Sequence, residues 1–139
     1  MEPWIQNVSM KDIIFGHHKP AGKNSMLIQI VDPDSDFPKP RDNFKEIYQF
    51  KFFDLEEEDT DISSNLKITS KQAKQIVKLL KHALVNDMPV VVHCHAGLCR
   101  SGAVAEVGVM MGFDDTGKVR LPNKMVKKML MKELGWGYD

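Results

Sequence analysis

Three stretches of the chain have the hydrophobic pattern of strands. Residues 25–31 (Ser-Met-Leu-Ile-Gln-Ile-Val) form a nearly continuous apolar run, which predicts a buried strand. In residues 47–53 aromatic side chains recur at every second position, which predicts a strand with one face against a core. A third run, the valines 90–92, leads directly into His93 and predicts another buried strand.

Three other stretches have helical spacing. Thr69-Ser70-Lys71-Gln72 is a capping box, and the apolar residues that follow it, up to Leu84, recur every three or four positions. Residues 101–111 are apolar nearly all round, which predicts a buried helix that ends at Gly112. A last helix is expected over residues 123–134, before Gly135.

The first 23 residues leave two alternatives open. Val8, Ile13, Ile14 and Phe15 could form a short helix or a first strand, and Ser9 could cap such a helix. The pair at positions 17 and 18, two histidines before a proline, is interpreted as a solvated turn rather than a metal site.

The order of these elements is strand, strand, helix, strand, loop, helix, helix. It predicts an α/β fold with a mostly parallel central sheet flanked by helices. Open sheets of this kind bind ligands at the carboxyl ends of their strands. We therefore expect a site between the central strand that ends near His93 and the helix that begins at Ser101.

Length and composition narrow the class of protein. The 139 residues are expected to form one domain over residues 1–139. The 19 basic and 19 acidic residues cancel, so no net field would attract nucleic acid or an acidic membrane. No apolar run approaches the ~20 residues that span a bilayer, and two cysteines do not form a disulfide framework. We expect a cytoplasmic protein without membrane or nucleic-acid partners, and we favour a monomer over an oligomer.

The chemistry of the chain is concentrated in residues 93–101. A loop that leads into a helix directs unpaired backbone N–H groups towards an anion, at the positive end of the helix dipole. Arg100 can donate two parallel hydrogen bonds to two oxygens of such an anion. Cys94 lies in the same field, which favours its thiolate, the nucleophilic form. Attack on a bound phosphorus would give a phosphocysteine that water then hydrolyses.

The other residues of this segment have expected supporting roles. Gly97 allows a sharp turn without a side chain in the way of the anion. Ser101 is placed to donate a hydrogen bond to the sulfur as it leaves. The phosphate-binding loop comprises His95, Ala96, Gly97, Leu98, Cys99 and Arg100, and His93 supports it. No metal or cofactor is required.

The motif His93-Cys94-x5-Arg100-Ser101 resembles the active-site loop of the cysteine-dependent protein tyrosine phosphatase superfamily. The chain as a whole resembles a compact member of its dual-specificity branch, of the bacterial or phage type. The resemblance implies a phosphorylated protein as substrate, carrying phosphotyrosine or phosphoserine and phosphothreonine. Phosphoinositide, nucleotide and RNA 5′-phosphate substrates stay open. One departure is Cys99, where such loops more often have a small or hydroxyl residue.

The resemblance also implies an aspartate general acid that follows directly on a strand. Asp54 matches that position, at the start of an acidic stretch over residues 54–61. The alternatives in the same stretch are Asp59, Asp61 and Glu56.

Other functions fit the same residues less well. His93, Cys94, His95 and Cys99 are potential zinc ligands, but consecutive side chains point apart. A rhodanese-like sulfurtransferase would need neither Asp54 nor Ser101, and a non-catalytic phosphate-binding module would not need all the reactive residues. Cys99 could form a reversible disulfide with Cys94, or could merely be a small residue that fits.

Overall fold

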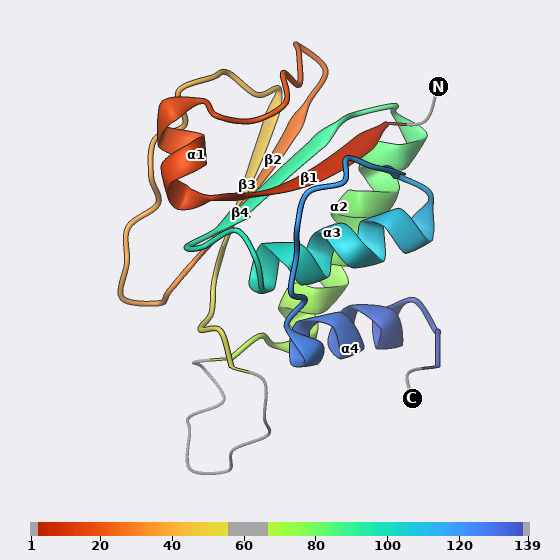
Figure 1. The fold of residues 1–139 in the computed structure, drawn as a ribbon. Helices are drawn as coiled ribbons and strands as arrows, with labels where there is room; N and C mark the ends of the chain where they lie inside the picture. Colours follow the sequence, from red (N-terminus) through yellow and green to blue (C-terminus); the bar gives the residue numbers. More distant parts are fainter. Residues whose placement is uncertain (1–2, 56–66, 138–139) are drawn as a thin grey trace.

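The structure is a computed structural model that describes residues 3–55 and 67–137. Within these residues, five parallel strands form one sheet in the order β3-β2-β4-β1-β5 (Figure 1). The strands are β1 (Trp4–Ser9), β2 (Met26–Val31), β3 (Glu46–Lys51), β4 (Val90–Cys94) and β5 (Asp114–Asp115). The predicted α/β class with a parallel sheet is confirmed, and β4 is its central strand.

Helices cover both faces of the sheet. They are α1 (Met10–Phe15), α2 (Ser70–Val85), α3 (Arg100–Met111) and α4 (Lys124–Glu133). Figure 1 shows α2, α3 and α4 together on one side of the sheet and α1 on the other. The core divides accordingly, because Val90 and Val92 face the large helical cluster while Val91 packs with Ile13 of α1. Burial on both faces explains why β2 and β4 are nearly continuous apolar runs.

Both alternatives for the N-terminus occur, one after the other. β1 ends at Ser9, and the Ser9 Oγ then accepts a hydrogen bond from the Asp12 backbone N–H (3.0 Å) to cap α1. The predicted order of elements lacked β1 and β5. Asn7 interrupts the apolar pattern of β1, and β5 has only two residues, so neither gives a strong local signal.

The solvated-turn interpretation of the histidine pair is wrong for His18. Its side chain is only 1% exposed, with Nε2 3.1 Å from the Asp42 Oδ2, and its ring packs against Phe44. His17 remains exposed. The chain folds back onto residues 42–44, a contact that the local sequence does not encode.

Two of the predicted helix starts are confirmed by their caps, whereas α3 begins at Arg100 without a side-chain cap. The Thr69 hydroxyl accepts from the Gln72 N–H (3.1 Å), and the Gln72 side chain accepts from the Thr69 N–H (3.0 Å). The Asn123 side chain caps α4 by accepting from the Val126 N–H (3.0 Å). In the part of the chain that the structure describes, no helix is long and apolar enough to cross a bilayer.

Candidate active site

The loop between β4 and α3 surrounds the sulfur of Cys94. Cys94 is the last residue of β4 and is 2% exposed. Its Sγ accepts a hydrogen bond from the Gly97 backbone N–H (3.3 Å) and lies 3.1 Å from the Ser101 Oγ. The contact with Ser101 that the sequence predicted is therefore present. The sulfur is thus in hydrogen-bonding contact with the loop backbone and with the first turn of α3.

The carbonyl groups of this loop point away from the sulfur because other parts of the chain bind them. The Asn7 Nδ2 donates to the Gly97 carbonyl (2.7 Å). The Met10 backbone N–H donates to the His95 carbonyl (3.1 Å). The Leu121 N–H donates to the Leu98 carbonyl (2.9 Å), and the Asn123 N–H donates to the Cys99 carbonyl (2.9 Å). A peptide carbonyl points opposite to the N–H of the same peptide unit. Holding four carbonyls outward thus leaves N–H groups facing inward, as an oxyanion requires.

Gly97 makes the sharp turn that the sequence predicted. Its φ is +77°, in the left-handed region that glycine adopts without a Cβ penalty. A Cβ here would lie 2.5 Å from the Ser9 backbone nitrogen and from the Val8 carbonyl carbon. The loop therefore packs directly on the backbone at the end of β1.

Arg100 is held at the edge of the loop. Its side chain is 5% exposed, and one terminal nitrogen donates both to the Asp32 Oδ1 (2.8 Å) and to the Phe52 carbonyl (2.7 Å). Its Nε is buried without a hydrogen-bond partner among the described residues, so this donor is available to a bound anion. Asp32 is a site residue that was not predicted from the sequence, since nothing in its local sequence indicates a contact with Arg100.

Asp54 is exposed beside the loop and is positioned by Asn123. The Asn123 Nδ2 donates to the Asp54 Oδ1 (2.5 Å) and to the Leu55 carbonyl (3.1 Å). Asn123 is fully buried. The sequence predicted it only as the start of a helix. The alternative acids Glu56, Asp59 and Asp61 lie outside the described residues.

One hollow of about 340 Å³ brings most of the predicted site residues together, but Gly97, Leu98 and Ser101 do not line it. It is lined by Asp32, Phe53, Asp54, Leu55, Cys94, His95, Ala96, Cys99 and Arg100. Neither Cys94 nor Cys99 is in a disulfide, and the redox hypothesis for Cys99 stays a prediction. Among residues 3–55 and 67–137, no three His, Cys, Asp or Glu side chains converge as metal ligands.

His93 lies fully buried behind the loop. Burial lowers its pKa to about 4, with a smaller contribution from the charge of Arg100, while the Cys94 carbonyl opposes the shift. Its Nδ1 is 3.3 Å from that carbonyl, which identifies Nδ1 as the protonated nitrogen of a neutral ring. The positive charge near Cys94 consequently comes from Arg100 and the start of α3, not from His93.

Comparison with known proteins identifies one family model and several solved structures that are similar to this chain. Residues 54–111, from Asp54 to the end of α3, match a family model described as Tc-R-P, a polymorphic toxin system DSP-PTPase phosphatase. The fold is similar to that of human DUSP28, with a TM-score of 0.58 and 17% identity over 94% of this chain and 91% of that one. It is also similar to human tyrosine phosphatase-like serine/threonine/tyrosine-interacting protein, with a TM-score of 0.54 and 16% identity over 80% and 76% of the two chains.

A viral tyrosine phosphatase, OH1 from the Orf virus, matches at 20% identity with a TM-score of 0.48. The alignment covers 78% of this chain and spans 56% of the viral one. Among curated proteins, no sequence matches this chain.

Proposed function

We propose that this chain is a member of the cysteine-dependent protein tyrosine phosphatase superfamily, in its compact dual-specificity-like branch, and that it hydrolyses phosphomonoesters on proteins through a phosphocysteine intermediate. The observation that carries the proposal is the position of the Cys94 Sγ. This sulfur accepts a hydrogen bond from the Gly97 backbone N–H, and Cys94 lines the same hollow as Arg100 and Asp54. We propose further that residues 1–139 act as one catalytic domain, without metal or cofactor.

The first step transfers the phosphoryl group to sulfur. The Cys94 thiolate attacks phosphorus, an S–P bond forms, and the P–O bond to the substrate side chain breaks. Asp54 gives its proton to the departing oxygen, so that no free alkoxide or phenoxide is released. Arg100 and the loop N–H groups bind the oxygens of the transferring group as their charge shifts.

The second step restores the enzyme. Water attacks the phosphorus of the phosphocysteine, and the Asp54 carboxylate accepts a proton from that water. The S–P bond breaks and the electron pair returns to sulfur. The Ser101 hydroxyl, 3.1 Å from the Sγ, donates a hydrogen bond that stabilises the returning thiolate.

Hydrolysis of p-nitrophenyl phosphate in the presence of a metal chelator tests this mechanism. Cys94→Ser should lower kcat at least about 1000-fold, because an alcohol is a far weaker nucleophile than a thiolate. Asp54→Ala should lower kcat by roughly 100-fold or more and remove the fall in rate on the basic side of the pH profile.

Asp114→Ala is the matched control, since Asp114 is an exposed carboxylate on the edge strand β5. It should keep the parent's rate. An inert parent, or an active Cys94→Ser variant, would overturn the proposal, and thiosulfate sulfurtransfer would then be assayed.

A further inference from the structure

A segment far along the chain runs beside the phosphate-binding loop. Residues 115–121 pass in front of α3 in Figure 1, between β5 and α4. The Asn7 Nδ2 donates to the Val119 carbonyl (3.0 Å) as well as to the loop, and the Leu121 N–H donates to the Leu98 carbonyl. The backbone of this segment is thus fixed directly against the loop.

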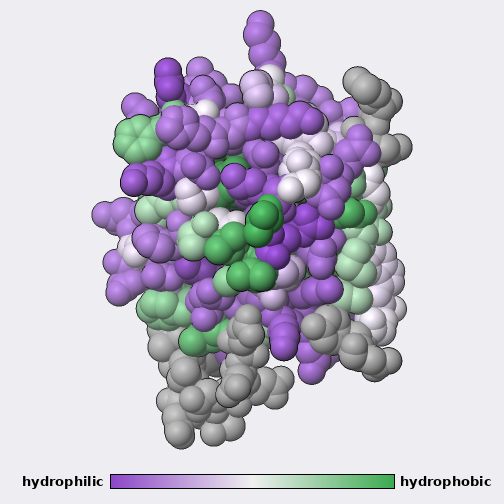
Figure 2. Space-filling model, in the orientation of Figure 1, coloured by the Kyte–Doolittle hydropathy of each residue, from purple (hydrophilic) through white to green (hydrophobic). Residues whose placement is uncertain are grey.

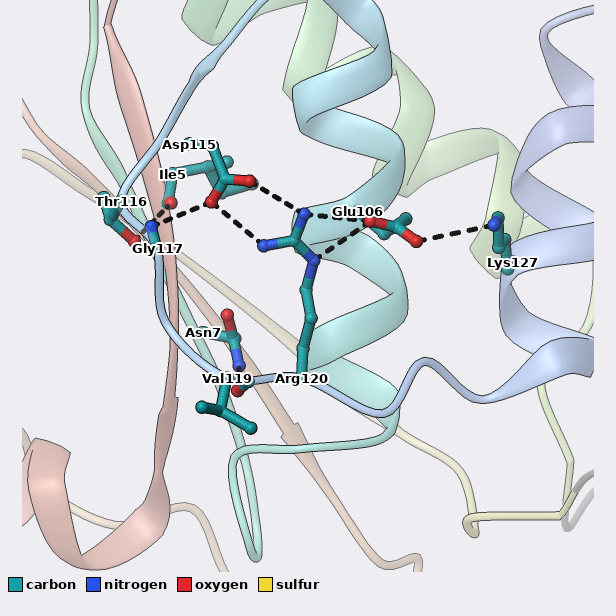
Figure 3. Close-up of polar contacts among 9 residues, drawn as sticks. All are labelled: Ile5, Asn7, Glu106, Asp115, Thr116, Gly117, Val119, Arg120 and Lys127. Atoms are coloured by element: carbon teal, nitrogen blue, oxygen red, sulfur yellow. Dashed lines mark hydrogen bonds and ion pairs between the residues drawn. The ribbon is translucent and has the colours of Figure 1, made fainter.

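Arg120 holds the middle of the segment towards the protein interior. Its guanidinium donates to both carboxylate oxygens of Asp115 (3.0 and 3.1 Å) and twice to one oxygen of Glu106 (3.1 and 2.9 Å), as Figure 3 shows. Lys127 lies 3.5 Å from the other Glu106 oxygen. Only 15% of the Arg120 side chain is exposed. The ion cluster fixes which way the neighbouring residues point.

Those neighbours are apolar and face water. Val119 is 72% exposed and Leu121 is 63% exposed, while Leu98 of the loop is half-buried beside them. We call Leu98, Val119 and Leu121 the apolar platform. Figure 2 shows hydrophobic side chains gathered near the middle of this face, where Figure 1 places the segment and the loop. Exposed apolar side chains that form one contiguous patch are typical of an interaction site.

The platform adjoins the active-site hollow. A second hollow, of about 450 Å³, is lined by Ser9, Asp12, residues 96–98 and residues 117–119. Ala96 lines both hollows, so the two adjoin at that residue. The second hollow has one cation, Lys118, and one anion, Asp12, so charge does not select its occupant.

We propose that the apolar platform binds the substrate polypeptide beside its phosphorylated residue and favours an apolar side chain there. The inference rests on the proposed phosphatase function and assigns the platform as its specificity element. The proposed occupant is the substrate itself, because the hollow lined by Leu98 and Val119 shares Ala96 with the hollow that contains Cys94.

The test compares phosphotyrosyl peptides that differ only beside the phosphotyrosine. One peptide has leucines on its N-terminal side, one has them on its C-terminal side, and one has serines on both sides. Each kcat/KM is divided by that for p-nitrophenyl phosphate, which has no flanking residue. For the parent, we expect one leucine peptide to exceed the serine peptide about tenfold, since an apolar contact of this size discriminates at that level.

In the double variant Val119→Ser with Leu121→Ser, the same ratio should fall to nearly one. Val85→Ser is the matched control, because Val85 is 82% exposed at the end of α2, outside both hollows. It should keep the parent's ratio. Thermal unfolding of all three proteins checks that the comparison is made between folded chains.

The outcomes separate the two proposals. If the parent does not hydrolyse p-nitrophenyl phosphate, both fail. If it does so but treats the three peptides alike, or if the double variant retains the preference, only the platform proposal fails. A parent dimer that the double substitution dissociates in sedimentation experiments would assign the platform to a second copy of the chain, and would also overturn it.

Discussion

Asn123 uses every polar group that it has. Its side-chain nitrogen binds Asp54 and the Leu55 carbonyl, its side-chain oxygen caps α4, and its backbone N–H binds the Cys99 carbonyl. One buried residue therefore connects the proposed acid with the phosphate-binding loop. Because an amide nitrogen only donates, this contact favours Oδ1 as the unprotonated oxygen and leaves Oδ2 to carry the proton that the proposed acid transfers.

Asn123→Ser tests this role, since serine keeps an oxygen for the helix cap but cannot reach Asp54. We expect kcat/KM to fall about tenfold more for phenyl phosphate than for p-nitrophenyl phosphate, because the poorer leaving group depends more on proton donation. Asn24→Ser, at an exposed asparagine, should change neither rate. Equal losses on both substrates would indicate a merely structural role.

At the scale of elements, the phosphate-binding loop depends on the end of β1. Gly97 lies against Val8 and Ser9 with no room for a Cβ, and its carbonyl is bound by Asn7 of the same strand. The loop conformation is thus set by a strand more than 80 residues earlier in the chain. The loop sequence supplies the glycine, and β1 supplies the surface against which it turns.

Gly97→Ala should reduce p-nitrophenyl phosphate hydrolysis by more than about 100-fold, because relieving the clash displaces N–H groups that bind the anion. Gly22→Ala is the matched control, since Gly22 has a similar φ (+79°) but open space around it. It should cost about 1 kcal/mol of stability through backbone strain alone and leave the rate unchanged. Similar rates for the two variants would show that space at Gly97 is not limiting.

For the whole molecule, burying His93 makes folding dependent on pH. Its pKa is about 4 in the folded chain and near 6.5 when unfolded. The unfolded chain therefore binds more protons between these values, and stability falls as pH decreases from 6.5 to 4. Above pH 6.5 the ring is neutral in both states and the effect vanishes. The full loss is about 3 kcal/mol.

Urea unfolding across this pH range measures the effect. The parent's free energy of unfolding should decline towards pH 4, and His93→Gln should flatten that decline even if it lowers stability overall. His17→Gln, at an exposed histidine, should retain the parent's slope. An unchanged slope in His93→Gln would contradict the assignment of a buried neutral ring.

Much of the fold and of the site could be predicted because the relevant information is local. Residues 93–101 hold the proposed nucleophile, the arginine, the serine and the turn glycine in one contiguous motif. The buried strands β2 and β4 are apolar runs, and α2 and α4 begin at residues whose side chains cap them. Short-range hydrogen bonding and side-chain periodicity determine these features, so the order of residues is sufficient.

Asn7, Asp32 and Asn123 could not be predicted as site residues, because each is a common polar residue in an unremarkable sequence context. Parallel strands bring their carboxyl ends to one edge of the sheet, and this places Asn7 of β1 and Asp32 after β2 beside the loop after β4. Asn123 lies beside the same loop only because the segment before α4 runs along this edge of the sheet, where Leu121 and Asn123 bind loop carbonyls. The sequence by itself determined the reactive groups, and the tertiary structure decided which distant polar groups hold them in place.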